Sequence, residues 1–466
     1  MHKSLIFFVI LFCSSFSCYS QVATGKNFKI DFGAKGDGTS DDSEAWHRAI
    51  QYFNEEKQGK LYIPEGTYRV GRQIIDQNPS NNISYATPAF KSTLSNIDGL
   101  TIEGELKNGK LVSVFKYIDN LKYGFFDPST GSPSADVSSE SYAEAGAFLL
   151  LSWSCSNVII KNLELDGNST HAIYNPAPKG KRGPDLGYIG ISSYGAKNVL
   201  IENIYVHHFG LDGIYIQTPR QKLSAGKYHA RLNKIKSEYN GRQGLSFTVG
   251  TNLYVSNSTF QHTGMAGIRI SPCANVDVEN HDKTGAPLSN SVFENCIIAN
   301  NQGGGGSLNI AGKVDSLLFK NCTIDAGEKT KNTNRIYAVQ MNFSPSRNVT
   351  FDGCNLNGVF LMYQKGKKMD DQGFTLLTNC TITDNNFSNK IPATQPLIDV
   401  YDRIKFDNCK FFINQNRKFI RSSVYNKNSR TLTDDVILEG CTIMDLTTKK
   451  NISGIQSRIT PNIKLR

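Results

Sequence analysis

Three similar passages between residues 205 and 271 carry the side chains best suited to acid–base chemistry. A titratable ring stands at the same place in each passage, five residues before a shared glycine, and the three rings are His208, Tyr239 and His262. Histidine and tyrosine side chains can take or give a proton at a reacting atom. If the passages stack, these rings form one column, and the sequence predicts a catalytic site beside it.

Polar side chains two residues after the shared glycines predict a binding face. Aligned on Gly213, Gly244 and Gly267, the passages place Tyr215, Ser246 and Arg269 between apolar neighbours. Strand residues alternate between two faces, so these polar side chains are expected to point outward. The same face is expected to continue to later strands and to a basic loop at 179–182. The predicted substrate-binding residues are Tyr215, Gln217, Ser246, Asn309, Lys181 and Arg182.

The residue types around the rings fit the β-elimination of a uronic-acid polymer. That reaction needs the carboxylate neutralised, the C5 proton removed and the leaving oxygen protonated. Arg269 or Arg242 is the candidate neutraliser, because a guanidinium binds a carboxylate with two parallel hydrogen bonds. The rings are the candidate base and acid, and Asp212 is expected to orient a histidine or to act as an acid or base itself.

Three alternatives stay open at this level. A glycoside hydrolase needs two carboxylates at a fixed separation, and Asp166, Asp185 and Asp212 are available near the rings. A uronan epimerase shares the proton-abstraction step of a lyase. A non-catalytic solenoid that binds glycans needs none of this chemistry.

A repeated phrase predicts the scaffold that positions these residues. A phrase of an apolar residue, any residue and asparagine or a similar residue recurs from Ile160 to Leu438, at intervals of 23 to 41 residues. This period, with short apolar strands and Gly/Asn turns, is typical of a β-solenoid. The third position is asparagine in most copies, and stacked asparagines can satisfy the backbone groups of turns. The longest intervals lie around the three passages, where we expect long loops.

Six cysteines occupy one position of this phrase. Buried cysteine behaves as a small apolar side chain, and stacked side chains point in the same direction rather than toward each other. We therefore predict a column of reduced core cysteines, formed by Cys296, Cys322, Cys354, Cys380, Cys409 and Cys441.

The segment that begins at Asp31 carries a family resemblance. Its phrase Asp-Phe-Gly-Ala-Lys-Gly-Asp-Gly-Thr-x-Asp-Asp, followed by a helix expected at about 41–56, resembles the N-terminal entry of the pectate-lyase superfamily. The resemblance implies an all-β fold, a right-handed parallel β-helix with a short N-terminal capping helix. We expect a signal peptide at 1–20 and one domain over 21–466: a cap at 21–75, loop-rich first rungs at 76–146, the main solenoid at 147–448 and a tail at 449–466. The aspartates of the phrase are expected to be structural.

The ends and the charge of the chain bear on its location and partners. Lys3 and the apolar run at 5–12 predict an export signal, with a lipid anchor at Cys18 disfavoured. The formal net charge of +10 suits an acidic polysaccharide, and its basic residues do not form the clusters typical of nucleic-acid binding. We expect a monomer without a membrane span. The chemistry above requires no cofactor, although Asp277, Glu279 and Asp282 predict a possible Ca²⁺ site.

Overall fold

The computed structural model describes most of the chain after the first 24 residues. The described residues are 25–77, 84–138, 140–177, 185–302, 306–327, 337–342, 347–363, 374–384, 395–400, 403–414, 417–422, 436–452 and 464–465. The predicted signal segment at 1–20 and Cys18 lie outside them.

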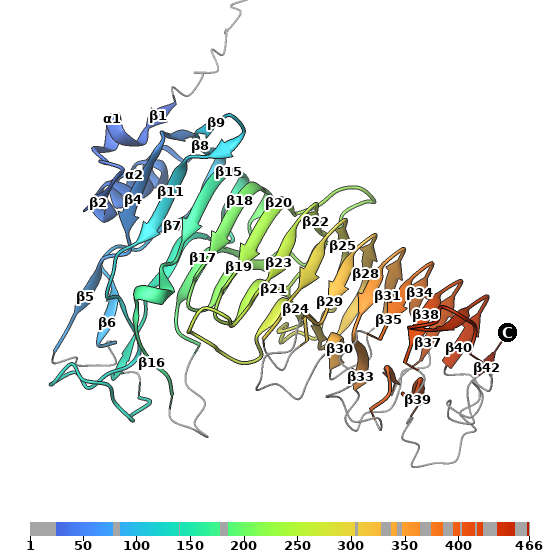
Figure 1. The fold of residues 1–466 in the computed structure, drawn as a ribbon. Coiled ribbons are helices and arrows are strands. Elements are labelled where there is room, and N and C mark those ends of the chain that lie inside the picture. Colours follow the sequence, from blue (N-terminus) through green and yellow to red (C-terminus); the bar gives the residue numbers. More distant parts are fainter. Residues whose placement is uncertain are drawn as a thin grey trace, which may run out of the picture.

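Two helices, α1 (Phe28–Phe32) and α2 (Ser43–Glu56), cover the N-terminal end of the solenoid (Figure 1). The α2 face made of Trp46, Ala49, Ile50 and Phe53 is buried, as its spacing predicts. Trp46 stacks on Phe148 with 4.9 Å between ring centroids.

The aspartates of the N-terminal phrase bind backbone groups. The Asp42 carboxylate accepts hydrogen bonds from the Lys35 and Gly36 amides at 2.6 and 3.0 Å, and so closes the loop before α2. The Asp37 carboxylate accepts hydrogen bonds from the Thr39 and Ser40 amides. These contacts fit the structural role that the sequence predicts.

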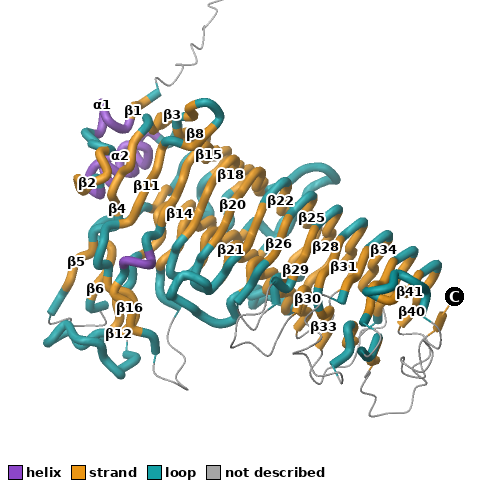
Figure 2. Tube along the Cα trace, in the orientation of Figure 1, coloured by secondary structure: helices purple, strands orange, loops and turns teal. Residues whose placement is uncertain are grey.

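Two long parallel sheets form the solenoid, a right-handed parallel β-helix (Figure 2). The larger sheet contains β1 (Lys26–Asn27), β2 (Asp37–Asp41), β3 (Gly59–Ile63), β4 (Gly66–Val70), β8 (Asp98–Gly104), β11 (Ser113–Tyr117), β15 (Ser156–Asp166), β18 (Lys197–His207), β20 (Ala230–Glu238), β22 (Leu253–Ser256), β23 (Thr259–Gln261), β25 (Leu288–Glu294), β26 (Ile297–Ala299), β28 (Val314–Lys320), β29 (Thr323–Asp325), β31 (Arg347–Asp352), β32 (Asn355–Asn357), β34 (Thr375–Thr378), β35 (Thr381–Thr383), β37 (Ile404–Asp407), β38 (Lys410–Ile413), β40 (Val436–Glu439), β41 (Thr442–Asp445) and β42 (Lys464–Leu465). The smaller sheet contains β7 (Thr93–Leu94), β14 (Gly146–Leu151), β17 (Tyr188–Tyr194), β19 (Asp212–Gln217), β21 (Gln243–Val249), β24 (Ala274–Glu279), β27 (Leu308–Ala311), β30 (Tyr337–Asn342), β33 (Val359–Tyr363), β36 (Ile398–Val400) and β39 (Ile420–Ser422).

A third sheet lies beside the first coils, at the lower left of Figure 1. It contains β5 (Gln73–Ile75), β6 (Ala86–Pro88), β12 (Lys122–Phe125), β13 (Tyr142–Ala143) and β16 (Ile173–Asn175). The aromatic residues of this region pack as core: Tyr123 and Phe126 are fully buried. A two-stranded ribbon, β9 (Leu106–Lys107) and β10 (Lys110–Leu111), and a 3₁₀ turn at Ser169–His171 complete the described elements.

The repeated phrase has the two structural consequences predicted for it. Its asparagines lie in the left-handed region of φ, where asparagine is tolerated better than most residues. Neighbouring copies bond along the axis: the Asn203 side-chain amide donates to Asn162 Oδ1 at 2.8 Å. The six cysteines of the phrase carry free thiols, and all except the half-buried Cys441 are buried.

Tyr188, the first residue of β17, is fully buried and stacks on Tyr117, with 5.6 Å between ring centroids. The side chain fills the corner where the third sheet meets the solenoid, which removes more apolar area from water than an outward position would.

Candidate active site

The three rings form a stacked column at the turn that follows the larger sheet. The ring centroids of His208 and Tyr239 lie 5.2 Å apart and those of Tyr239 and His262 lie 4.8 Å apart, with interplanar angles of 12° and 13°. These distances match the spacing of neighbouring coils in a parallel solenoid. His208, Tyr239 and His262 are called the ring column below.

The backbone at the ring column is conformationally costly. The φ angles of His208, Tyr239 and His262 are 55°, 56° and 59°, in the left-handed region. Asn300, with φ of 57°, takes the next position, because its carbonyl accepts the His262 amide. An aromatic residue in this conformation costs about 1–3 kcal/mol and is found most often at functional sites. Asparagine would satisfy the turn alone, so the rings point to a role beyond folding.

A second row of polar side chains runs beside the ring column. The strand register aligns Asp166 of β15, His207 of β18, Glu238 of β20 and Gln261 of β23, with Lys116 of β11 preceding them. We call these five residues the carboxylate row. Sequence reasoning considered Asp166 as a hydrolase acid and missed His207 and Glu238. An alternation of apolar and polar residues marks Tyr205-Val-His207, so a signal was present for His207, whereas Lys236-Ser-Glu238 is polar throughout and gave none.

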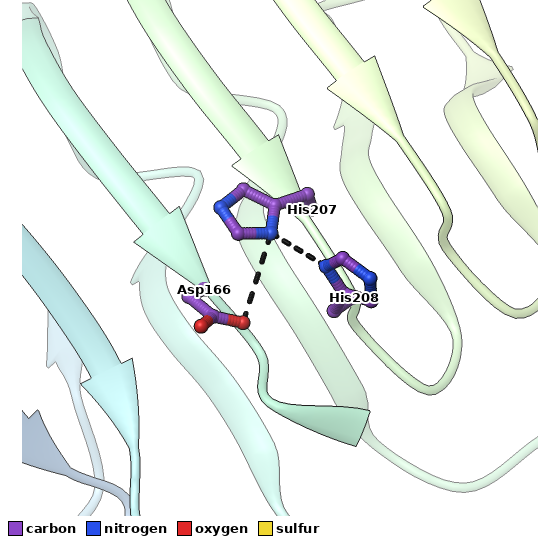
Figure 3. A group of neighbouring side chains, drawn as sticks. All are labelled: Asp166, His207 and His208. Carbon is purple, nitrogen blue, oxygen red and sulfur yellow. Dashed lines mark hydrogen bonds and ion pairs between the residues drawn. The ribbon is translucent and has the colours of Figure 1, made fainter. Parts of the chain in front are cut away.

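His207 and His208 approach each other closely next to Asp166 (Figure 3). Their Nδ1 atoms lie 2.6 Å apart, and His207 Nδ1 lies 3.7 Å from Asp166 Oδ1. The second ring nitrogen of His207 lies 3.4 Å from Glu164 Oε1. Burial, together with the neighbouring His207, lowers the pKa of His208 below its ordinary value. The neutral form of His208 is therefore favoured.

Glu238 connects the carboxylate row to the last ring. Its Oε1 atom lies 3.8 Å from His262 Nδ1, and its carboxylate accepts hydrogen bonds from Gln261 and from Tyr205. Burial raises the pKa of Glu238, but the hydrogen bonds and the charge of Lys236 outweigh it and leave this pKa lowered. Glu238 is therefore an anion whose charge lies beside the His262 imidazole, at a distance too long for a hydrogen bond.

The structure corrects the predicted place of Arg269. Strand β21 pairs with β24 so that Ser246 faces Asp277, and the third passage at residues 262–273 forms a loop rather than a strand. Arg269 therefore does not continue the Tyr215–Ser246 row. Its side chain is exposed on the loop that follows His262, where a Cβ atom added at Gly264 would lie 3.4 Å from Arg269 Cγ. Arg269 interacts with the Cys273 side chain, and no ion pair of Arg269 is found among the described residues.

Arg242 and Asp212 form a separate, buried pair on the smaller sheet. Arg242 donates two hydrogen bonds to Asp212, at 2.8 and 2.6 Å, and its third nitrogen lies 3.0 Å from Asp185. Burial lowers the pKa of Arg242, but the charge and hydrogen bonds of Asp212 outweigh it and raise this pKa above its ordinary value. The guanidinium is already paired with two carboxylates, so it is not free to neutralise the carboxylate of a substrate.

The predicted binding face on the smaller sheet is largely closed. Ser246 and Asn309 are buried, and both are bonded to neighbouring side chains: Ser246 Oγ donates to Asp212 at 2.9 Å, and the Asn309 amide donates to Asp277 at 2.7 Å. Neither side chain is open to a substrate in this structure, so their contact with a substrate stays a prediction. Tyr215 and Gln217 are partly exposed and bond to each other at 2.8 Å.

Two models of known protein families match this chain. The family model described as rhamnogalacturonase A/epimerase, pectate lyase-like, matches residues 27–268. The chain belongs to this family. A second model, described as a right-handed β-helix region, matches residues 223–388. The family assignment agrees with the resemblance carried by the Asp31 phrase. A comparison with curated protein sequences found no match.

Solved structures of several β-helix proteins are similar to this member of the pectate lyase-like family. The A-module of a mannuronan C-5 epimerase from Azotobacter vinelandii is 14% identical, with a TM-score of 0.49 over 94% of this chain and 99% of that one. A tailspike from Acinetobacter baumannii bacteriophage Fri1, a capsular polysaccharide depolymerase, is 11% identical, with a TM-score of 0.49 over 93% and 66%. An exopolygalacturonase from Thermotoga maritima is 14% identical, with a TM-score of 0.37 over 89% and 92%.

Two further sites predicted from the sequence are the basic loop at 179–182 and the calcium loop. Lys181 and Arg182 lie outside the described residues. The three acids of the predicted calcium loop do not come together, because Asp277 is buried against Gln243 and Asn309, whereas Asp282 pairs with Arg220. Across the described ranges, the one group of three or more metal-binding side chains is Asp166, His207 and His208.

No helix in the described part of the chain is long and apolar enough to cross a membrane.

Proposed function

We propose that this protein is an exported enzyme that cleaves a uronic-acid-containing polysaccharide by β-elimination at the ring column. The stacked rings of Tyr239 and His262, with the exposed Arg269 on the loop that follows His262, carry the proposal. Membership of a pectate lyase-like family supports the substrate class. The export segment at 1–20 remains a prediction, and it agrees with a substrate found outside the cell.

Each group has one task in this reaction. Arg269 binds the uronate carboxylate, which acidifies the proton on C5. His262, whose imidazole lies 3.8 Å from the Glu238 carboxylate, takes that proton. The C4–O bond then breaks, a C4–C5 double bond forms, and the Tyr239 hydroxyl protonates the leaving oxygen. No metal or redox partner is needed to balance these steps.

The hydrolase alternative loses one of its predicted acid pairs. Asp212 and Asp185 both bind the guanidinium of Arg242, so neither is free to give a proton to a leaving oxygen. The epimerase alternative uses the same base and neutraliser, but it returns the proton to C5 and leaves the chain uncut. The products therefore distinguish the three reactions.

The test measures products on pectate, alginate and glycosaminoglycans. We expect ultraviolet absorbance from an unsaturated product together with new reducing ends on one of these polymers. Reducing ends without absorbance would establish a hydrolase. A change of uronate configuration without cleavage would establish an epimerase. No reaction on any uronate polymer would refute the proposal and favour a binding role.

Single substitutions test the assigned roles without disturbing the turn. Tyr239→Phe keeps the stacked ring and removes the hydroxyl, and we expect a loss of about 100-fold or more in kcat. His262→Asn keeps a residue that suits the left-handed φ, as Asn300 shows at the next position. Tyr254→Phe is the matched control, because Tyr254 is a partly exposed tyrosine bonded to Glu294 outside the ring column. Full activity in both Tyr239→Phe and His262→Asn would overturn the assignment.

A further inference from the structure

Three ligand-type atoms from two neighbouring coils converge beside the ring column (Figure 3). They are Asp166 Oδ1, His207 Nδ1 and His208 Nδ1, all within 4.8 Å of one another. The register of β15 with β18 places Asp166 opposite His207, and the left-handed φ of 55° turns His208 back toward both. None of the steps proposed for elimination uses His207 or Asp166.

Glu164 Oε1 lies 3.4 Å from His207 Nε2, which allows a hydrogen bond when the neutral imidazole carries its proton on Nε2. His207 Nδ1 is then a lone pair directed toward Asp166 and His208. A carboxylate that holds the far nitrogen of an imidazole is the usual arrangement behind a metal-bound histidine.

In this tautomer of His207, Nδ1 and Asp166 Oδ1 are both acceptors, and their separation of 3.7 Å is too long for a hydrogen bond. Two ligands of one tetrahedral Zn²⁺ ion, each about 2.1 Å from it, lie roughly 3.4 Å apart. A cation between them would therefore satisfy both atoms with little movement.

The other two contacts of the cluster are compatible with this arrangement. The Nδ1 atoms of the two imidazoles lie 2.6 Å apart, and in this tautomer of His207 a proton on His208 Nδ1 would join them. Binding of an ion through both Nδ1 atoms would place the His208 proton on Nε2 and move the two nitrogen atoms apart. Lys116 lies 3.2 Å from Asp166 Oδ2 and leaves the ligand oxygen Oδ1 free.

We propose that Asp166, His207 and His208 bind one divalent transition-metal ion, with Glu164 as the orienting residue. Two imidazole nitrogens and one carboxylate oxygen favour Zn²⁺ or a neighbouring first-row ion over Ca²⁺, which prefers oxygen ligands. Three protein ligands leave at least one position open to water or to a substrate oxygen. The site does not depend on the uronate reaction.

Metal binding by the full exported chain tests this proposal without an activity readout. The protein is freed of metal with a chelator and titrated with Zn²⁺ by calorimetry, and with Co²⁺ by absorbance. We expect one ion per chain with micromolar affinity or tighter, and a higher unfolding temperature with the ion. His208→Asn and Asp166→Asn should weaken binding by at least 100-fold, and Glu164→Gln by about 10- to 100-fold.

His262→Asn is the matched control, since it removes a stacked imidazole of the same column that is not a ligand. It should bind the ion as the unchanged protein does. Asparagine suits the backbone at both positions, so His208→Asn should fold, and circular dichroism checks this. The absence of stoichiometric binding, or an equal loss in His262→Asn and His208→Asn, would overturn the proposal. Neither outcome depends on whether the enzyme cleaves a polymer.

Discussion

Replacing Arg242 by methionine separates a structural role of this residue from a catalytic one. Arg242 is 13% exposed and binds Asp212, which is fully buried. The substitution would leave the Asp212 carboxylate with the Ser246 hydroxyl, 2.9 Å away, as its remaining side-chain donor. Breaking a buried ion pair by removing one partner costs about 3–5 kcal/mol. With an unfolding entropy of about 2 cal/mol/K per residue, this corresponds to a fall of roughly 3–5 °C in Tm.

Substitution of Asp212 should destabilise the protein less than substitution of Arg242. In Asp212→Asn, Arg242 keeps the ion pair with Asp185, which is 56% exposed and 3.0 Å away. The expected loss is therefore smaller, about 1–3 kcal/mol for an imperfectly satisfied buried group. The double variant Arg242→Met/Asp212→Asn carries no unpaired buried charge, and it should recover about 2 kcal/mol relative to the sum of the single losses.

Thermal unfolding followed by far-ultraviolet circular dichroism measures these differences. The matched control is Lys107→Met, which breaks a pair with Glu65 in which both side chains are exposed, by 62% and 52%. A surface pair contributes only about 0–1 kcal/mol, so Tm should change by about 1 °C or less. Equal losses in Arg242→Met and Lys107→Met would refute the reasoning from burial. A loss of activity in Arg242→Met without any change in Tm would assign Arg242 to the reaction instead.

Three further predictions concern stability. Burial raises the pKa of Asp277 to about 7. The protonated carboxyl therefore stabilises the fold below about pH 4, and this contribution, up to about 4 kcal/mol, is lost as the pH rises to about 7. Asp277→Asn should show a smaller fall in Tm over this pH range, and a pH profile identical to that of the unchanged protein would contradict the raised pKa of Asp277. Dithiothreitol should leave Tm unchanged, because the cysteines of the solenoid are free thiols; a large fall would indicate disulfides. Asn203→Gly should cost less than Asn203→Ala, because the φ of 52° strains a residue with a Cβ by about 1–2 kcal/mol; the reverse order in Tm would show that the side-chain ladder outweighs the backbone.

The elements that follow a strict repeat were predictable from the sequence. The asparagine and cysteine positions recur in a fixed place of the phrase, and a parallel coil superimposes such places at about 4.8 Å. The ring column follows the same rule, because His208, Tyr239 and His262 each come directly after an outward residue at the end of a larger-sheet strand.

The positions that depend on insertions were not predictable in this way. Gly267 aligns with Gly213 and Gly244 in sequence, but residues 264–273 loop out and β24 begins at Ala274. The smaller sheet therefore continues with Asp277 rather than Arg269. A short insertion costs little closure entropy, so pairing of the apolar residues of β24 with β21 decides the register.

The sequence by itself determined the architecture, the reduced cysteine column and the stacking of three rings. These follow from periodicity, since equivalent positions of successive coils must lie on top of one another. Only the tertiary structure decided which charges meet: Arg242 with Asp212, Glu238 with His262, and Asp166 with His207 and His208. Such contacts join different coils through side-chain directions and loop lengths. The neighbours of the ring column are therefore residues that periodicity alone did not identify.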